Sequence, residues 1–548
     1  MKKLSAVLLI FIVFFQFSFA QAPKKPTSGE IYEAIEKLNF LGSVLYLAAH
    51  PDDENTRLIS YFANDVKART AYLSITRGDG GQNLIGPELR ELLGVIRTQE
   101  LLAARSVDGG EQFFTRANDF GYSNHPDETL EIWNKTEVLN DVVAVIRKFK
   151  PDVIVNRFNA NTPGSTHGHH TSSAMLSVEA FDLASDKMYK THLKNDEVWK
   201  PKRLFFNTSW WFYGSEENFK RADKTNLLSV EVGDFYQNLG LSNGEIAALS
   251  RSQHQSQGFG STGSRGNQTE YLEFLKGDFP KNKTVFDGID TSWNRVEGGK
   301  IIGEILQKVA KEYNFKNPAA SISDLVKAYS LIQNLKDEHW KTIKSKEIVD
   351  IISACSGLFV EVVANESTST NGSKNKISVE AINRSLSKIM LKSIHLKSLN
   401  VDKITNVQLK NNEPFAFNFD VEIPAEIKIT TPYWLTEKGT LGMYKVENKQ
   451  FIGMPETPRE IVANFLVEIS GVEIPINKEV VFKYNDPVKG EVYKPFEILP
   501  EVSTTFTEKV FVFSNEDSQK VSLKVKSVKE NLSGKLSLCY PENWKVQP

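Results

Sequence analysis

The first half of the chain alternates short apolar runs with stretches that carry apolar side chains at helical spacing. The apolar runs predict three buried strands, at Ser43–Ala49, Ala71–Thr76 and Asp152–Phe158. The stretches between them predict helices over residues 87–104 and 129–150. This order is typical of an α/β fold with a mainly parallel sheet. Functional side chains in such sheets gather at the carboxyl ends of the strands.

The pattern changes after residue 300. Apolar side chains from Ile301 to Tyr313 share one helical face, and two more helices are expected over residues 325–335 and 348–364. The polar segment STSTNGSK, residues 367–374, reads as a linker or loop. Runs of β type follow, at Lys376–Ala381, Phe415–Ile423 and Glu479–Tyr484. They favour a β-sandwich.

The N-terminus has the pattern of a secretory signal peptide. Lys2 and Lys3 precede an apolar run over residues 6–15, and Ser18-Phe19-Ala20 fits a cleavage site before Gln21. An uncleaved anchor is the alternative, but the run is shorter than the roughly 18 apolar residues that span a bilayer. We therefore expect a secreted or periplasmic protein with no membrane span in the mature chain.

Composition excludes several classes of protein. The 548 residues include 66 Lys and Arg against 68 Asp and Glu, so the net charge is −2 and no basic excess marks a nucleic-acid partner. Hydrophobic residues make up 40% of the chain, which is ordinary for a globular protein. Two cysteines are too few for a disulfide framework, and Cys355 lies in an apolar helical stripe that predicts a buried filler.

Candidate chemistry begins where the first predicted strand ends, in Ala49-His50-Pro51-Asp52-Asp53-Glu54. Taken alone, this segment also fits an Asp that caps a helix. A second cluster, Thr166-His167-Gly168-His169-His170, places three of the nine histidines within four residues after another predicted strand. In a parallel sheet, both segments can converge at one edge.

The two clusters together fit a catalytic zinc site. Such a site typically takes three protein ligands and leaves one position for water. His50, Asp53 and one of the later histidines satisfy that count, and Asp52 is the adjacent candidate for the base.

At these residues the sequence resembles the PIG-L or LmbE-like zinc N-deacetylases, whose signature is an AHPDDE strand end followed by a paired-histidine motif. The resemblance covers roughly residues 43–185, with looser agreement to about residue 300. It implies that His50, Asp53 and His170 hold zinc and that Asp52 is the general base. It also gives His167 the role of stabilising the developing oxyanion or protonating the leaving amine.

Two further features bear on this resemblance. His169 stands where the best-known form of the family motif has an acidic residue. The run RGDGGQN, residues 77–83, is comparable with a Gly-rich loop that lines the family's site, and Asp79 within it is a candidate substrate contact. A phosphate cradle is the alternative, but the Lys-Ser/Thr pair of such a loop is absent.

Arg97 and Asp119 are the other candidate substrate contacts. Arg97 and Glu100 lie three residues apart on a predicted helix, where they would form a weak surface ion pair. The resemblance instead makes Arg97 a contact to a sugar hydroxyl. Asp119 is either a turn residue or a contact at the rim of the site.

Two motifs outside these clusters imitate functional ones. His125-Pro126-Asp127-Glu128 precedes a helix, so it predicts a turn and a helix cap rather than a ligand set. Trp210-Trp211-Phe212-Tyr213 fits either stacking on sugar rings or core packing.

The chain is expected to divide into five segments. They are the signal peptide (1–20), a Rossmann-like PIG-L-type domain (21–300), a helical segment (301–366), a β-sandwich domain (367–495) and part of a second sandwich (496–548). Residues 534–548 resemble the opening strands of a CARDB-like sandwich repeat. Too few residues follow to complete one, so we expect the C-terminus to be truncated relative to its relatives.

We therefore expect an exported zinc-dependent hydrolase. It would remove acetyl from an N-acetylated amino sugar, such as an N-acetylglucosamine-type glycan, by metal-activated water. A His/His/Asp site also accepts iron or another divalent ion. Two alternatives stay open: a glycan-binding surface protein without catalysis, and a zinc amidase that acts on a different amide.

Overall fold

The computed structural model describes residues 25–161, 166–508, 510–515, 517–528 and 531–547. The expected signal peptide, residues 1–20, lies outside the described residues. Within the described ranges, no helix combines the length and the apolar character needed to cross a membrane.

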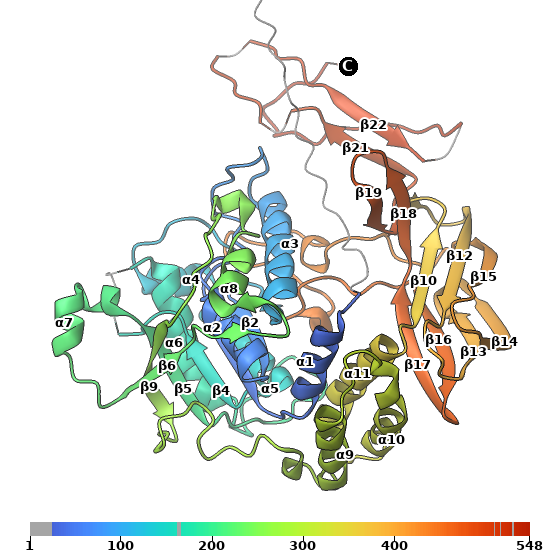
Figure 1. Ribbon diagram of the computed structural model, residues 1–548. Helices are drawn as coiled ribbons and strands as arrows, with labels where there is room; N and C mark the ends of the chain where they lie inside the picture. The colour runs from blue at the N-terminus through green and yellow to red at the C-terminus, as the bar shows by residue number, and fades with distance from the viewer. Residues whose placement is uncertain (1–24, 162–165, 509, 516, 529–530, 548) are drawn as a thin grey trace, which may run out of the picture.

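The first half of the chain folds around a seven-stranded sheet of order β3-β2-β1-β4-β5-β9-β6 (Figure 1). The parallel strands are β1 (Ser43–Ala48), β2 (Arg69–Ser74), β3 (Glu111–Phe114), β4 (Val153–Asn156) and β5 (Arg203–Thr208). At one edge, β9 (Thr269–Gly277) pairs antiparallel with β5 and with β6 (Leu227–Glu231). The expected α/β fold is confirmed, and its three predicted strands correspond to β1, β2 and β4.

Helices cover both faces of this sheet because its strands are apolar on both sides. Leu45 and Leu47 of β1 share a buried cluster with α5 (Lys135–Phe149) and α6 (Gly168–Leu183). Val44 and Tyr46 share another with α2 (Thr56–Ser60) and α3 (Glu91–Asp108). The smaller elements are α7 (Glu216–Arg221), β7 (Phe235–Tyr236), β8 (Leu241–Ser242) and α8 (Asn243–Arg251).

Two predicted helices differ in their ends. The helix expected over residues 129–150 is two helices, α4 (Pro126–Ile132) and α5. Asn134 has a φ of +53°, which interrupts the right-handed helix between them. The helix expected over residues 87–104 is α3, which begins at Glu91 and ends at Asp108.

The structure also changes the prediction for the helical segment, residues 301–366. α9 (Lys300–Lys311), α10 (Ile322–Ile332) and α11 (Glu338–Cys355) pack with α1 (Ser28–Leu38). The helix expected over residues 348–364 is wrong beyond Cys355, because Gly357 has a φ of +54° and residues Phe359–Ala364 form strand β10. Cys355 is buried at the end of α11, as its stripe predicts.

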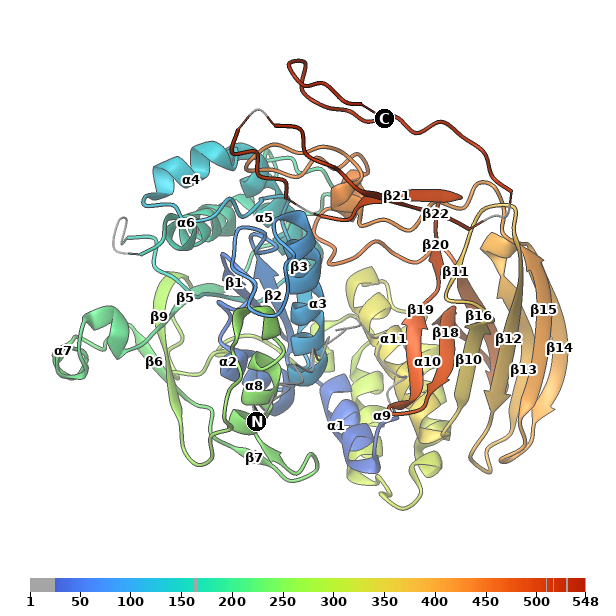
Figure 2. The same ribbon diagram turned by 90° about the horizontal axis from the view of Figure 1, so that it is seen from above.

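The second half of the chain contains two packed sheets, of order β15-β12-β10-β18-β19 and β14-β13-β16-β17. Their remaining strands are β12 (Lys374–Ile382), β13 (Ile389–Leu396), β14 (Val401–Leu409), β15 (Phe415–Glu422), β16 (Val462–Ile469), β17 (Val472–Glu479), β18 (Val481–Asp486) and β19 (Gly490–Pro495). Figures 1 and 2 place α9, α10 and α11 beside these sheets, on the side that faces the seven-stranded sheet. One continuous apolar core joins these helices to both sheets.

Three features complete the second half. β10 precedes residue 367, the predicted start of the sandwich, and pairs with both β12 and β18. Within the expected linker, β11 (Thr368–Ser369) pairs with β20 (Glu497–Ile498). β21 (Val502–Phe506) and β22 (Leu523–Ser527) form a separate antiparallel pair.

Residues 424–461, between β15 and β16, are here named the bridging segment. This segment leaves the sandwich and packs against the domain that contains the seven-stranded sheet. Its buried Tyr433, Trp434 and Tyr444 form an apolar cluster that includes Val95 of α3. The backbone N–H of Phe114, in edge strand β3, also donates to the Gly453 carbonyl at 3.2 Å, so the second half of the chain contacts the edge of the first sheet directly.

Candidate metal centre

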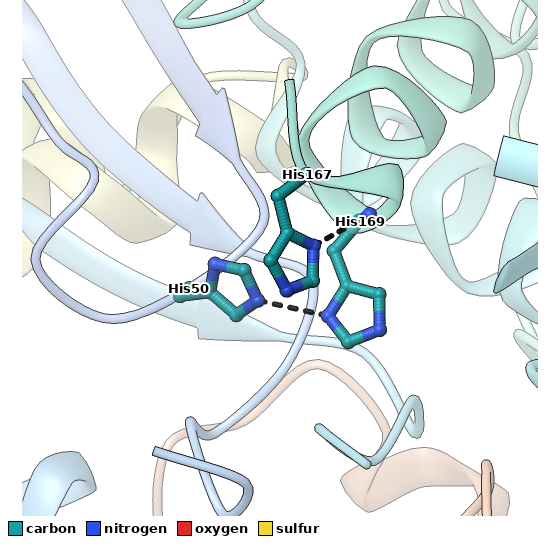
Figure 3. A group of neighbouring side chains, drawn as sticks. All are labelled: His50, His167 and His169. Carbon is teal, nitrogen blue, oxygen red and sulfur yellow. Dashed lines mark hydrogen bonds between the residues drawn. The ribbon is translucent and has the colours of Figure 1, made fainter. Parts of the chain in front are cut away.

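The two predicted clusters meet at one edge of the seven-stranded sheet. His50 follows β1, and its carbonyl oxygen accepts a hydrogen bond from the hydroxyl of Tyr72. His167 caps the N-terminus of α6, and His169 lies in the first turn of that helix. Since β1 and β4 are parallel neighbours and α6 follows β4, the topology brings these side chains together. Figure 3 shows His50 facing His167 and His169.

The ligand set implied by the family resemblance is assembled. Asp53 Oδ2 lies 3.1 Å from His50 Nδ1 and also accepts a hydrogen bond of 2.8 Å from the His50 backbone N–H. Asp53 Oδ1 lies 3.6 Å from His170 Nε2. One potential ligand atom from each of the three residues lies within 4.8 Å of the other two. The His170 ring stacks on Phe158 at 3.9 Å between centroids, which fixes its plane.

A second group of possible ligands shares His50. His50, His167 and His169 also offer ligand atoms within 4.8 Å of one another. His50 Nε2 lies 2.9 Å from His169 Nδ1, and His169 Nε2 is buried without a hydrogen-bond partner among the described residues. The residue that departs from the family motif thus lies inside the histidine cluster.

The protonation states of Asp53 and His170 suit a cation. Burial lowers the pKa of His50, but Asp53 raises it above its usual value, so a bound metal would have to displace a proton from that ring. Burial alone would raise the pKa of Asp53, but the imidazoles of His170 and His50 lower it below its usual range. Burial lowers the pKa of His170 to about 4, although Asp53 opposes the shift. An ionised carboxylate and a neutral imidazole are the forms that bind metals. The donor set therefore fits a divalent ion such as zinc.

Asp52 is held beside this set in an uncommon conformation. Its φ of +90° is strained for a residue other than glycine, and such strain concentrates at functional sites. Arg97 Nη2 donates a 2.8 Å hydrogen bond to Asp52 Oδ2. Burial raises the pKa of Asp52 to about 6, against the opposing charge of Arg97.

The three candidate substrate residues lie around the same edge but are buried. Asp119 faces the cluster, with Oδ2 4.0 Å from His50 Nε2 and Oδ1 3.8 Å from His169 Nδ1. Asp79 accepts a hydrogen bond from the hydroxyl of Tyr444, and its burial raises its pKa to about 7. Arg97 is only 3% exposed. Contact of these three residues with a sugar stays a prediction.

The surface ion pair between Arg97 and Glu100, one of the two alternatives for Arg97, is wrong. Both side chains point inward from α3 and are buried. Arg97 pairs with Asp52, whereas Glu100 accepts hydrogen bonds from the backbone N–H and the hydroxyl of Ser256. The spacing of three residues predicts that the two side chains are neighbours on the helix. It does not show whether that side of the helix faces solvent or the core.

Sequence reasoning missed a buried network beneath Asp52. Glu54 Oε2 accepts a 2.9 Å hydrogen bond from the Asp52 backbone N–H. Glu54 Oε1 lies 2.8 Å from His254 Nε2 and 3.2 Å from Arg105 Nη2. The AHPDDE motif signals Glu54, but a lone histidine 200 residues away carries no signal of its own.

The two imitating motifs have distinct structures. His125 caps α4, where its ring accepts a 3.3 Å hydrogen bond from the backbone N–H of Asp127, so the predicted turn and cap are confirmed. Trp210 and Trp211 are 49% and 58% exposed after β5, so neither packs in the core. Phe212 packs on Phe206 at 4.8 Å between ring centroids.

Comparison with known families supports the resemblance. Residues 45–181 match the family model described as PIG-L: GlcNAc-PI de-N-acetylase. This range contains every residue of the histidine cluster together with Asp52 and Asp53. The resemblance to the PIG-L family is therefore confirmed over these residues. No curated protein matches the chain.

Two solved structures are also similar to parts of the chain. One is N,N'-diacetylchitobiose deacetylase from Pyrococcus horikoshii complexed with its inhibitor MPG, at 16% identity over 38% of this chain and 70% of that chain, with a TM-score of 0.27. The other is the alkylpurine DNA glycosylase AlkC from Pseudomonas fluorescens bound to DNA containing an abasic site analog, at 10% identity over 34% and 50%, with a TM-score of 0.13. TM-scores this low support no conclusion about this chain.

Proposed function

We propose that this protein is an exported zinc-dependent hydrolase that removes the acetyl group from an N-acetylated amino sugar. The observation that carries the proposal is the convergence of His50, Asp53 and His170, with Asp52 held beside them, within the range that matches the PIG-L model. The activity after which that family is described, GlcNAc-PI de-N-acetylase, supports the amino-sugar substrate, and the pattern at residues 1–20 supports export.

His50, Asp53 and His170 would hold the ion. A divalent ion there would polarise the amide carbonyl and lower the pKa of water. Asp52, with a pKa of about 6, is mostly ionised at neutral pH and can accept the proton that the attacking water loses. Arg97 holds one oxygen of that carboxylate, so the orientation of Asp52 is set before substrate binds.

His167 is suited to the other side of the reaction. Its Nδ1 accepts a 3.1 Å hydrogen bond from the backbone N–H of His169 (Figure 3). In the neutral ring, this bond leaves the proton on Nε2. Burial and the nearby His50 lower the pKa of His167, so the ring is neutral at pH 7. The Nε2–H group can therefore donate to the negative charge that develops on the amide oxygen.

The test combines metal analysis with product analysis on the chain lacking residues 1–20. We expect about one zinc per chain, the stoichiometry of a single catalytic site. Acetate release from N-acetylglucosamine oligomers should stop on addition of a chelator and return with zinc. His170→Ala should lose the metal. Asp52→Asn should keep it and lose about 1,000-fold in kcat, within the range that general acid–base catalysis supplies.

Each other outcome overturns a defined part of the proposal. Bound metal without acetate release would indicate a different amide substrate, and a different metal in the analysis would replace zinc. Binding of glycan without stoichiometric metal would indicate a glycan-binding protein without catalysis. Normal turnover by Asp52→Asn would remove Asp52 from the mechanism.

A further inference from the structure

The bridging segment is joined to the loops at the edge of the seven-stranded sheet. The backbone N–H of Tyr444 donates to the Arg116 carbonyl at 2.8 Å, and the Asn118 N–H donates to the Gly442 carbonyl at the same distance. Between them, Ala117 and Met443 form an antiparallel β-bridge. These bonds continue the loop after β3 into the bridging segment, so the segment is fixed in register against that loop.

The same segment holds the Gly-rich turn at residues 77–81 through Arg77. The Arg77 side chain is completely buried. Its guanidinium donates to the carbonyls of Pro455 at 2.9 Å and Met454 at 3.0 Å, and it lies 3.4 Å from the centroid of the Trp434 ring. A planar guanidinium that is bonded at its edge and stacked on its face has little freedom to move.

The bridging segment also contacts the turn at a second residue, Asp79. The hydroxyl of Tyr444 donates to Asp79 Oδ1, while Asp79 Oδ2 is buried without a hydrogen-bond partner among the described residues. Tyr444 is therefore the side chain that fixes the position of this carboxylate. Arg77 and Asp79 are the residues before and after Gly78, so the bridging segment binds both sequence neighbours of that glycine.

Gly78 connects the turn to Asp52, the proposed base, through Arg97. Its carbonyl oxygen accepts a 3.1 Å hydrogen bond from Arg97 Nη1, while Arg97 Nη2 donates to Asp52 Oδ2 at 2.8 Å. The fit is tight, because a Cβ atom at Gly78 would lie 2.4 Å from Arg97 Nη1. A displacement of the turn would move the guanidinium, and with it the partner of Asp52.

We propose that the bridging segment is part of the active centre and that Tyr444 is a positioning residue. Tyr444 fixes Asp79, the turn fixes Arg97, and Arg97 orients Asp52. The kinetic part of this proposal rests on the proposed deacetylase function. The structural part, in which Tyr444 restrains the turn, does not.

The test compares Tyr444→Phe with Tyr493→Phe in the chain lacking residues 1–20. Tyr493 is the matched control, because its buried hydroxyl also donates to a carboxylate, at 2.5 Å from Glu361, but within the sandwich. Tyr444→Phe should lower kcat by about ten-fold, the loss typical of one buried hydrogen bond, with KM and metal content unchanged. Backbone amides of residues 75–98 should exchange hydrogen faster. Tyr493→Phe should change neither property.

A second variant tests the same bond from its other end. Asp79→Asn should lower kcat to a similar extent, and the double variant with Tyr444→Phe should lose no more than either single variant. If Asp79 instead binds the sugar, Asp79→Asn will raise KM and Tyr444→Phe will not reproduce it. That result would overturn the positioning role.

The two parts of the proposal fail separately. If the wild-type protein releases no acetate, the deacetylase function fails, and hydrogen exchange alone decides whether Tyr444 restrains the turn. If Tyr444→Phe lowers only the thermal midpoint, as Tyr493→Phe would, the bridging segment is a structural contact and the proposal is overturned. Unchanged exchange over residues 75–98 would overturn it as well.

Discussion

The two flanks of the histidine cluster are built differently. On the β2 flank, residues 77–79 and Asp119 are buried, and the bridging segment binds Arg77 and Asp79. On the β5 flank, Trp210 and Trp211 stand half exposed on the turn that follows the strand. Buried polar groups with fixed partners suit the orientation of catalytic side chains. Exposed flat aromatic rings suit contact with a large ligand. We therefore expect the covered flank to hold the catalytic side chains and the open flank to contact the substrate.

Among the replacements that test the covered flank, that of Arg97 should cause the largest loss of activity. If Arg97 positions Asp52, Arg97→Met should lower kcat by about 100-fold and leave KM unchanged, because the lost interaction serves the chemical step. Arg97→Lys should recover part of the loss, since an ammonium can pair with Asp52 but cannot also reach Gly78 in the same planar geometry.

The kinetic pattern also decides between the two roles of Arg97. A rise in KM with kcat unchanged, measured on N-acetylglucosamine oligomers, would instead make Arg97 the sugar contact that the family resemblance implies. In that case the covered flank would bind substrate, and the contrast between the flanks would be lost.

Glu54 tests whether the covered flank also supports the fold. Glu54→Gln leaves Arg105 without one partner of a buried ion pair, so we expect a loss of about 3 kcal/mol in the free energy of unfolding at pH 7. The measurement is urea unfolding followed by tryptophan fluorescence. Glu297→Gln is a suitable control, because both side chains of the ion pair between Glu297 and Lys336 are exposed.

The same variant has a predictable pH dependence. Burial opposes ionisation of Glu54, but His254 and Arg105 lower its pKa from 4.5 to about 2. A carboxyl whose pKa is lower in the folded than in the unfolded protein stabilises the folded state. This stabilisation is complete when the pH is above the unfolded-state pKa, and it is lost as the pH falls toward the folded-state pKa. The difference between wild type and Glu54→Gln should therefore shrink between pH 4.5 and 2. A constant difference over that range would show that the charge of Glu54 is not what stabilises the protein.

Trp211 tests the open flank and should give the smallest effect. Trp211→Ala should raise KM for N-acetylglucosamine oligomers by about five-fold, within the range expected for one lost ring-stacking contact. KM for the monosaccharide and kcat for both should stay unchanged. Tyr213→Ala, on the same turn, is the control. An equal rise for monomer and oligomer would place Trp211 at the reacting sugar and contradict its role as a more distant contact.

The sequence was informative where function depends on local pattern and on sheet topology. Apolar runs located β1 and β4, and parallel pairing explained why the loop at His50 meets the start of α6. The short run Phe359–Ala364 is predicted as the end of a helix but forms strand β10, because a few apolar residues satisfy helical and strand periodicity equally well. Only the pairing of β10 with β12 and β18 decides between them.

The partners of the site residues could not be read in the same way. Arg97 and Glu100 have the spacing of an ion pair, but tertiary packing gives each a different partner. His254 and Tyr444 lie in segments with no recognisable motif, and their contacts with Glu54 and Asp79 depend on how distant segments pack. The residue pattern therefore predicts the helices and strands that position a site. It does not predict the tertiary contacts that orient the side chains of that site.

The bridging segment also has a consequence for the order in which the chain folds. Tyr444 lies 365 residues from Asp79, and Met454 lies 377 residues from Arg77. Contacts of such high contact order form late, because closing a long loop costs conformational entropy before the contact repays it. The cluster at His50 can assemble from the first third of the chain, but the support of Asp52 is complete only once the sandwich has folded. Full activity would therefore appear only in a completely folded molecule, so a chain in which only the N-terminal domain has folded would stay poorly active until its last domain is in place.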